Sequence, residues 1–258
     1  MPRLLVTGGS GYLGGEIVRL AAARGWDVRA THLTGPPSGD ADWRRLDNRD
    51  AGAVEAAVAG VDAVVHTAYR QCDDAWTVNA DASAVVAHAA RDVRLVHISS
   101  DLVFAGTVGR YREEDVPAPV NAYGRSKAEA ERRVADAHPG ATIARTSLIY
   151  GGHVPGQQER LARTGTRFFT DEIRSPVQVG DLAAALLELI AVEHAGPLHL
   201  GGADDVSRFE FALLLGADPS RAEQALTTPD RAPDVSLDSS LAGALLSTCL
   251  RGCREVLA

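Results

Sequence analysis

The sequence contains very little lysine. Lys127 is the one lysine among 26 lysine and arginine residues. The net charge of −8 at pH 7 leaves no positive surplus of the kind that binding to duplex nucleic acid or to an anionic membrane surface requires. Hydrophobic residues still make up 45% of the 258 residues, so the chain can bury a sizeable core and is not expected to be disordered.

Cysteine is also scarce. The three cysteines, Cys72, Cys249 and Cys253, fit neither a metal-ligand spacing nor a disulfide framework. Cys249 and Cys253 are four residues apart in a segment expected to be helical, where we interpret them as small buried hydrophobic residues. The eight histidines form no HExxH or similar array, so we expect no metal site.

Long hydrophobic runs are missing as well. The longest, residues 182–192, is short and contains Glu188, so we expect no membrane-spanning helix. The first expected strand begins at Arg3, which we interpret as leaving no room for a signal peptide. Together these features predict a cytoplasmic protein.

The start of the chain has the pattern of a dinucleotide-binding turn. An apolar run over residues 3–7 leads into Gly8, Gly11 and Gly14, and an amphipathic segment follows. Glycines at this spacing allow a tight turn, close approach of the backbone to a pyrophosphate, and close packing of the helix on the strand. We therefore expect the cofactor to contact the turn residues Gly8, Ser10, Gly11, Tyr12, Leu13 and Gly14.

The second expected strand, residues 27–31, bears on cofactor choice. It ends near His32, where NAD-selective domains usually present a carboxylate to the adenosine ribose. His32 is not a carboxylate, and Arg29, Arg44 and Arg45 are close enough in sequence to meet a 2′-phosphate. The pattern favours NADP(H), with NAD(H) as the alternative.

Further cofactor contacts are expected at the ends of the next strands. Asp47 is a candidate partner of the adenine amino group, while Asp50 is expected to cap a helix over residues 51–59. A strand over residues 61–67 ends in Thr67 and is followed by Ala68 and Tyr69, and the small Ala68 would let a cofactor pass close. In a long helix expected over residues 73–91, Asn79 either ties backbone together near the site or lies on the helix surface.

Tyr123 and Lys127 are the central catalytic candidates. A helix expected over residues 121–138 places them four residues apart on one face. A phenol titrates near pH 10, and a neighbouring ammonium favours its anion, which brings proton exchange with a substrate closer to neutral pH. Two unrelated surface side chains at this spacing are the alternative. The single lysine and the glycine turn favour the catalytic interpretation.

The substrate side is expected to be built from later segments. A strand over residues 94–98 leads to Ser100, a hydroxyl at the sheet edge where open α/β proteins bind ligands. A strand over residues 141–149 carries three polar residues, and we interpret residues 152–176 as an irregular polar lid with Arg167, Asp171 and Arg174 as candidate contacts. The expected substrate contacts are Arg145, Thr146, Ser147 and Arg174.

The remaining segments predict helices over residues 179–193 and 207–215, a strand over 197–200 and an amphipathic C-terminal helix over 239–257. The amphipathic helices are compatible with a homodimer.

Seven motifs in order give the chain a family resemblance: TGGSGYLG (7–14), HTAY (66–69), VNADAS (78–83), ISSDLVFAG (98–106), YREEDVPAPVNAYGRSKAEAE (111–131), ARTSLIYG (144–151) and RSPVQVGDLA (174–183). The chain resembles the extended short-chain dehydrogenases/reductases, and among them the dTDP-4-dehydrorhamnose reductase group. The resemblance implies an α/β fold, a Rossmann-like doubly wound parallel sheet with a small C-terminal substrate-binding part. It implies an NAD(P)-binding domain at residues 1–150 and a substrate part at 151–258, with the strand and helix of 174–200 returning to the main sheet.

The resemblance also implies roles for the catalytic candidates. In that group the aligned residues would be Tyr123 as proton donor, Lys127 on the nicotinamide ribose, and Ser100 on the substrate carbonyl. The related sugar-nucleotide dehydratases have an Asp-Glu pair where this chain has Asp101-Leu102, so we expect simple reduction of a keto group on a nucleotide-linked sugar or related metabolite. A non-catalytic regulatory protein of the same fold and a nucleotide-sugar epimerase remain the alternatives.

Overall fold

The computed structural model describes residues 2–34, 41–70, 76–164, 167–223 and 230–258. Contacts between Cα atoms divide the chain into two compact units. Unit 1 consists of Met1–Ser99, Ser126–Ala144 and Leu186–Pro197, and unit 2 of Ser100–Arg125, Arg145–Ala185 and Leu198–Ala258. This interleaving differs from a single boundary near residue 150, and the assignment of 1–150 to the cofactor and 151–258 to the substrate stays a prediction.

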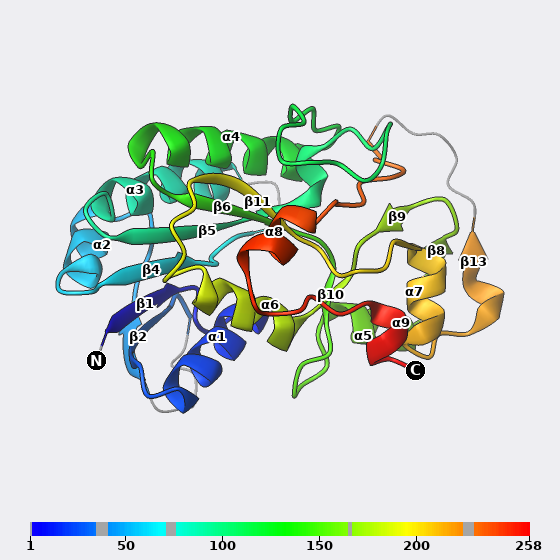
Figure 1. The fold of residues 1–258 in the computed structure, drawn as a ribbon, viewed down its shortest axis with the longest axis horizontal. Coiled ribbons are helices and arrows are strands. Elements are labelled where there is room, and N and C mark those ends of the chain that lie inside the picture. The colour runs from blue at the N-terminus through cyan, green and yellow to red at the C-terminus, as the bar shows by residue number, and fades with distance from the viewer. Residues whose placement is uncertain (1, 35–40, 71–75, 165–166, 224–229) are drawn as a thin grey trace. The chain divides into compact units, whose positions relative to one another are not determined.

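A seven-stranded sheet has the order β11-β6-β5-β4-β1-β2-β3 (Figure 1). Its strands are β1 (Arg3–Thr7), β2 (Asp27–His32), β3 (Asp42–Arg45), β4 (Ala63–His66), β5 (Arg94–Ser100), β6 (Thr142–Thr146) and β11 (Gly196–Leu200). The pairs β1–β2, β2–β3, β1–β4 and β4–β5 are all parallel. The order 3-2-1-4-5-6 is that of a doubly wound Rossmann sheet, which confirms the predicted fold class. β11 joins this sheet, as expected for the 174–200 segment.

Helices that follow the strands of unit 1 match the expected positions closely. They are α1 (Tyr12–Ala23), α2 (Ala51–Val58), α3 (Ala82–Ala89) and α4 (Ala122–Ala137), the last beginning in unit 2. The Asp50 carboxylate accepts a hydrogen bond from Ala53 N at 3.0 Å, which confirms it as the cap of α2. The long helix expected over 73–91 is confirmed in its described part, where residues 76–89 are helical, with a π-helical turn, Thr77–Asp81, before α3. Residues 73–75 lie outside the described residues.

The core of unit 1 is aliphatic. Its fully buried members include Leu5, Val54, Val64, Val86 and Leu95, so strands β1, β4 and β5 pack against α2 and α3. Burial of side chains of this size stabilises the fold by about 1.5–3 kcal/mol each relative to exposure.

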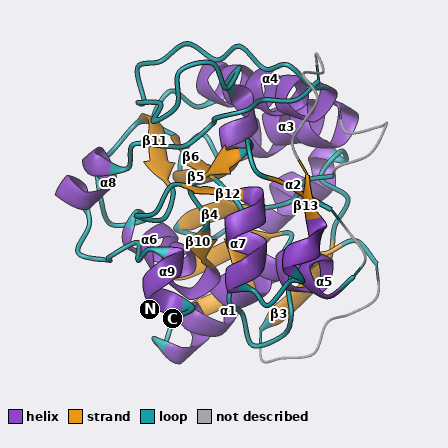
Figure 2. Cartoon of the chain, turned by 90° about the vertical axis from the view of Figure 1, so that its right-hand side faces the viewer, coloured by secondary structure: helices purple, strands orange, loops and turns teal. Residues whose placement is uncertain are grey.

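Unit 2 is made of short elements joined by long loops. Its strands are β7 (Ile149–Tyr150), β8 (Phe168–Phe169), β9 (Ile173–Arg174), β10 (Val177–Gln178), β12 (Val206–Ser207) and β13 (Ala222–Glu223). Its helices are α5 (Gln157–Arg163), α6 (Val179–Glu188, which continues into unit 1), α7 (Arg208–Leu214), α8 (Ser240–Leu245) and α9 (Cys253–Val256), with 3-10 turns at Asp101–Val103 and Pro219–Arg221. Figure 2 shows α7 beside α5 and α9, and α7 contacts each of these two helices.

The irregular lid expected over residues 152–176 is wrong. This segment contains α5 and the strands β8 and β9. Ala162 and Phe168 are buried in a cluster with Ala212 of α7, so apolar contacts order the segment despite its polar composition. Distant apolar partners of this kind are not visible in a local sequence pattern.

The single C-terminal helix expected over residues 239–257 is also wrong. α8 ends at Leu245, and α9 begins only at Cys253. Ser, Thr and Cys at 247–249 are poor helix formers, and an ion pair between Arg251 and Asp181 (2.8 Å) fixes the intervening chain. Cys253 is buried as expected, whereas Cys249 is exposed, so it is not a buried hydrophobic residue. Cys72 lies outside the described residues.

Within the described residues no helix is both long and apolar enough to cross a membrane. The same residues hold no group of three or more His, Cys, Asp or Glu side chains placed to bind a metal ion.

Candidate active site

The glycine turn between β1 and α1 is tightly built. Gly8 adopts a φ of +73°, its amide donates to Thr31 Oγ1 at 3.1 Å, and its carbonyl oxygen accepts from Gly11 N at 2.9 Å. A Cβ on Gly14 would overlap the Gly8 carbonyl oxygen. The turn therefore has the close packing of strand, loop and helix that a phosphate-binding turn requires.

The residues that follow β4 pack against this turn. Thr67 Oγ1 donates to Thr7 O at 2.8 Å, and a Cβ on Gly8 would lie 2.8 Å from Ala68 N. Tyr69 follows as an exposed side chain, 52% accessible. The structure thus brings Thr67 and Ala68 to the glycine turn, while Ser10 and Tyr12 lie near its surface and Leu13 is buried beneath it.

The residues expected near the adenosine ribose are arranged along two neighbouring strands. His32 on β2 is the register partner of Arg45 on β3, and its ring packs edge-on against Trp43. Arg29 and Arg44 both pair with Asp42, at 3.1 and 2.8 Å. Arg45 is exposed, and its Nε donates to Leu33 O at 3.3 Å, so of the three arginines it is the one without a carboxylate partner in the described chain.

Asp47 follows β3 and is paired with Arg49. The Arg49 guanidinium lies 2.5 Å from the Asp47 carboxylate, and this hydrogen bond lowers the pKa of Asp47 to about 2. The carboxylate is therefore ionised at neutral pH. Its predicted contact with adenine stays a prediction.

Lys127 is buried in unit 1, with 3% of its surface accessible. Its Nζ donates to the carbonyl oxygen of Ile98, near the end of β5, at 2.6 Å. Burial lowers the pKa of Lys127 to about 8, against an opposing effect of Glu131. At neutral pH the lysine is thus an ammonium that can lose its charge more easily than an exposed lysine.

Asn79 ties backbone together beside this lysine. Its Oδ1 accepts from Arg70 N and its Nδ2 donates to Arg70 O, both at 2.9 Å, and Nδ2 also lies 2.9 Å from Ser126 Oγ. The side chain is fully buried. This confirms the structural interpretation of Asn79, because the amide links the segment after β4 to the residue preceding Lys127.

Two buried histidines near Lys127 were not anticipated. The rings of His66 and His97 stack with centroids 5.3 Å apart, and His66 contacts Thr7 Oγ1 at 2.5 Å and Ser83 Oγ at 3.1 Å. Burial, together with the charge of Lys127, lowers the pKa of His66 to about 3 and that of His97 well below its usual value. Both imidazoles are therefore neutral. The sequence signal that could have predicted their contact is the pairing of β4 with β5, which places His66 beside His97.

In unit 2, Ser100 ends β5 and starts the polar part of the site. Its Oγ donates to Asp101 Oδ1 at 3.0 Å and accepts from Leu102 N at 3.2 Å. Asp101 is 4% accessible, and its other oxygen accepts from Ser147 Oγ at 2.6 Å. Burial raises the pKa of Asp101, while the charge of Arg174 and these hydrogen bonds act in the opposite direction.

Tyr123 lies at the start of α4, in the same unit as Ser100. Asn121 Oδ1 accepts from Gly124 N at 2.7 Å and so satisfies the first turn of the helix. A Cβ on Gly124 would overlap the Leu102 carbonyl oxygen. The half-buried Tyr123 therefore begins a helix that packs directly on the segment following Ser100.

The expected substrate residues differ in their surroundings. Arg145 is 2% accessible, lies 5.0 Å from the centre of the Phe104 ring, and its Nη1 lies 3.3 Å from His199 Nε2. Thr146 Oγ1 donates to Leu200 O at 3.1 Å. These two side chains are engaged inside unit 2, whereas Ser147 reaches Asp101, and their substrate contacts stay predictions.

A group of charged residues in unit 2 interacts with Asp101 and with one another. Arg174 donates to Ile173 O at 2.7 Å and lies 3.7 Å from the Glu172 carboxylate, which also accepts from Arg231 at 2.6 Å. Arg208 shares this environment, since burial and then the charge of Arg174 lower its pKa, while Glu172 and Asp101 act in the opposite direction. Sequence reasoning missed Arg208, Arg231 and Glu172; Arg167 is exposed and Asp171 half-buried.

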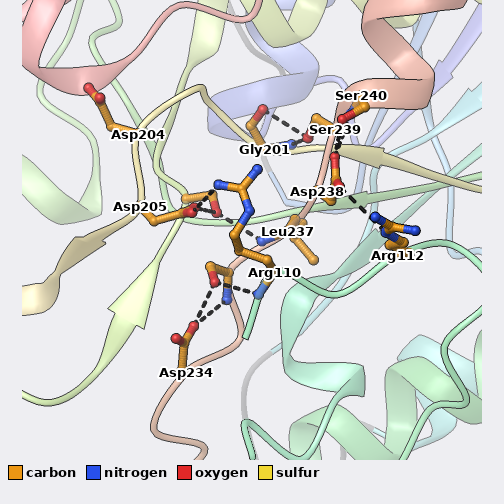
Figure 3. Close-up of polar contacts among 12 residues, drawn as sticks. Arg110, Arg112, Gly201, Asp204, Asp205, Asp234, Leu237, Asp238, Ser239 and Ser240 are labelled. Carbon is orange, nitrogen blue, oxygen red and sulfur yellow. Dashed lines mark hydrogen bonds and ion pairs between the residues drawn. The ribbon is translucent and has the colours of Figure 1, made fainter. Parts of the chain in front are cut away.

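A separate cavity of about 460 Å³ lies between the 106–112 loop, the end of β11 and the α8 region of unit 2. Figure 3 shows Arg110 reaching Asp205 and Arg112 reaching Asp238, at 2.8 and 3.7 Å. Ser239 Oγ accepts from Gly201 N at 2.9 Å in the same region. The contacts of Arg112 with Asp238 and of Ser239 with Gly201 hold the C-terminal segment on unit 2.

Comparison with known proteins places the chain among reductases of nucleotide sugars. The model of the RmlD substrate binding domain matches residues 2–233. The dTDP-4-dehydrorhamnose reductase of Mycolicibacterium smegmatis is 36% identical over 244 residues, covering 85% of this chain and 71% of the relative.

Solved structures agree with this placement. A hypothetical dTDP-4-dehydrorhamnose reductase from Sulfolobus tokodaii has a TM-score of 0.82 and 31% identity and covers 96% of both chains. The dTDP-4-dehydrorhamnose reductase of Bacillus anthracis in complex with NADP has a TM-score of 0.84 and 25% identity over 100% of this chain and 96% of that one. The chain therefore belongs to the RmlD substrate binding domain family, within the extended short-chain dehydrogenases/reductases.

Proposed function

We propose that the protein is an NADPH-dependent reductase of a keto group on a nucleotide-linked sugar. The observation that carries the proposal is the pairing on α4 of Tyr123 with a buried Lys127, one helical turn apart. The family relatives named as dTDP-4-dehydrorhamnose reductases support the reaction class.

In this proposal each residue has a defined task. Bound NADPH would supply a hydride to the carbonyl carbon. The Tyr123 hydroxyl donates a proton to the carbonyl oxygen, and Ser100 holds that oxygen by a hydrogen bond. The ammonium of Lys127, fixed by Ile98 O, stabilises the phenolate that Tyr123 becomes after proton transfer. The sum of these steps converts a ketone to an alcohol.

The residues present fit a dinucleotide. The tight glycine turn and the small Ala68 leave room for a pyrophosphate close to the backbone. Arg45, exposed beside His32, is the group best suited to a 2′-phosphate, which favours NADP(H) over NAD(H). The complex of the Bacillus anthracis relative with NADP supports this choice.

The charged cluster of unit 2 fits an anionic substrate. Arg174, Arg208 and Arg231 lie around Glu172, and Asp101 also acts on Arg208. The surplus positive charge suits the phosphates of a nucleotide-linked sugar. The substrate itself is proposed from the relatives, whose names refer to dTDP-linked keto sugars.

The test is a titration of the purified protein with NADPH and NADH, followed by a panel of dTDP- and UDP-linked keto sugars while the cofactor absorbance is recorded. Oxidation of NADPH by one of them is the expected result. Tight binding of NADPH without oxidation by any of them would favour the regulatory alternative. Retention of oxidised cofactor after purification would favour the epimerase.

A further inference from the structure

We propose that Asp101 is a positioning residue whose charge state decides where the Ser100 hydroxyl hydrogen points. With Asp101 ionised, the hydrogen points to Asp101; with Asp101 protonated, it is available to the substrate oxygen. The inference rests on the proposed function, in which Ser100 contacts the carbonyl. It concerns a residue one position beyond the catalytic serine.

The hydrogen-bond inventory of Ser100 carries the argument. A serine hydroxyl has one hydrogen and two lone pairs. One lone pair accepts from Leu102 N at 3.2 Å, and the hydrogen lies toward Asp101 Oδ1 at 3.0 Å. An ionised carboxylate can only accept, so Ser100 must be the donor in this contact. What then remains on Ser100 is a lone pair, which cannot donate to a carbonyl oxygen.

Protonation of Asp101 at Oδ1 reverses this arrangement. The carboxyl O–H then donates to Ser100 Oγ, both lone pairs of the serine are used, and its hydrogen is free for the substrate oxygen. Asp101 Oδ2 can continue to accept from Ser147 Oγ at 2.6 Å. No bond other than hydrogen bonds changes in this switch, and the proton is exchanged with solvent.

Opposing effects act on the charge state of Asp101. Asp101 is 4% accessible, which disfavours its anion, and burial raises its pKa. The charged groups of the described chain that face it are Arg174 on β9 and Arg208 on α7, and both favour the anion. Desolvation and the arginines therefore oppose each other, as a titrating switch requires.

Hydrogen bonds to neighbouring residues orient the Ser147 hydroxyl toward Asp101. Its Oγ accepts from Ser175 N at 3.3 Å, and Ser175 Oγ donates to Asp205 Oδ1 at 2.7 Å. Arg110 in turn donates to Asp205 at 2.8 Å (Figure 3). This chain of contacts orients the Ser147 hydrogen toward Asp101, and it stabilises the anion.

The direction of reaction should respond to the switch. A ketone needs a donor from Ser100 and is served by protonated Asp101. An alcohol carries its own hydrogen and can donate to the free lone pair of Ser100 when Asp101 is ionised. Reduction should therefore weaken as pH rises through the Asp101 titration, whereas oxidation of the product should not weaken in that range.

The first test uses kcat/KM against pH for reduction of a dTDP-linked 4-keto sugar by wild type, Asp101→Asn and Asp101→Ala. An asparagine whose Nδ2 faces Ser100 and whose Oδ1 faces Ser147 imitates the protonated acid. Asp101→Asn should keep most of the activity and lose the decline that Asp101 causes, so that only the decline from Lys127 near pH 8 remains. Asp101→Ala should be less active, by about tenfold or more. Asp136→Asn, which removes an exposed carboxylate on α4, is the control and should keep the wild-type profile.

The second test does not depend on turnover. The titration of Asp101 is followed by carboxyl NMR of protein carrying ¹³C-labelled aspartate, with the resonance assigned by Asp101→Asn. Ser147→Ala removes a donor to the anion and should move the midpoint upward by about one pH unit.

The inference is overturned if the whole pH profile of Asp101→Asn is the same as that of wild type, or if this variant is as inactive as Asp101→Ala. It is also overturned if the Asp101 midpoint does not move in Ser147→Ala. A protein that shows the NMR shift but oxidises no NADPH would contradict the proposed function and leave the coupling between Ser147 and Asp101 established.

Discussion

Lys127 Nζ donates a hydrogen bond to the carbonyl oxygen of Ile98 at 2.6 Å. This contact fixes a buried ammonium to the end of a central strand, one helical turn from Tyr123 along α4. Burial of an ammonium costs free energy that one hydrogen bond to a neutral carbonyl offsets only in part, which supports the proposed catalytic role of Lys127.

Removal of this ammonium should abolish the reaction. Lys127→Met keeps the length of the side chain and removes the charge, and we expect kcat to fall by at least about 10²-fold. The wild-type protein should also lose activity as pH rises through about 8, because Lys127 then becomes neutral. A variant that retains full activity at pH 7 would contradict the assigned role.

The glycine turn offers a matched pair of substitutions. Gly14→Ala places a Cβ against the Gly8 carbonyl oxygen, whereas the Cβ of Gly15→Ala would lie 3.6 Å from Gly9 O, an ordinary contact. We expect Gly14→Ala to weaken NADPH binding at least about tenfold, since overpacking of this kind costs about 1–3 kcal/mol. Gly15→Ala should bind NADPH as the wild type does. Calorimetric titration with NADPH measures both affinities, and circular dichroism verifies that each variant is folded. Equal affinities of the two variants would contradict the expectation.

Arg45 should determine the preference for NADPH. Replacement by glutamine removes the exposed guanidinium next to His32, and we expect the Kd of NADPH to rise about tenfold while that of NADH stays unchanged. Arg24→Gln, an exposed arginine at the end of α1, is the control. Equal weakening of both dinucleotides in Arg45→Gln would show that the side chain does not meet the 2′-phosphate.

His199 should make stability depend on pH. Arg145 can only donate, so His199 Nε2 accepts its hydrogen bond and Nδ1 donates to Tyr111 O at 2.9 Å, which requires a neutral ring. Burial, then Arg145, lowers the pKa of His199 to about 4. Between the usual value near 6.5 and about 4, the unfolded chain binds a proton that the folded chain does not.

Lowering the pH from about 6.5 to about 4 should therefore reduce the free energy of unfolding. His199 contributes on the order of 3 kcal/mol at most to this reduction. Denaturant unfolding at pH 7 and pH 4.5 measures the difference. His199→Asn should be less stable than wild type at pH 7 and lose part of the pH dependence, while the exposed His88→Asn should change neither. An unchanged pH dependence in His199→Asn would refute this assignment.

The sequence was sufficient for the parts of the fold that depend on local patterns. The strand over residues 3–7, the glycine turn and the helix carrying Tyr123 and Lys127 follow from hydrophobic periodicity, glycine spacing and helix propensity. The parallel arrangement of the strands follows from the alternation of strand and helix.

It was not sufficient where distant residues decide the structure. Phe168 and Ala162 are ordered by α7, and Arg251 by Asp181, so both the 152–176 segment and the C-terminal region differ from expectation. The same holds for the Asp101–Ser147 hydrogen bond, whose partners are 46 residues apart. Ser100 could be nominated from its strand end, but the direction of its hydrogen depends on contacts that no local pattern reveals.

The most direct test of the account is the rate of NADPH oxidation with a dTDP-linked 4-keto sugar by wild type and Tyr123→Phe, measured alongside the Kd of NADPH. The account predicts turnover by the wild type, a loss of at least about 10²-fold in kcat for Tyr123→Phe, and similar NADPH affinity for both proteins. Full activity of Tyr123→Phe would contradict it.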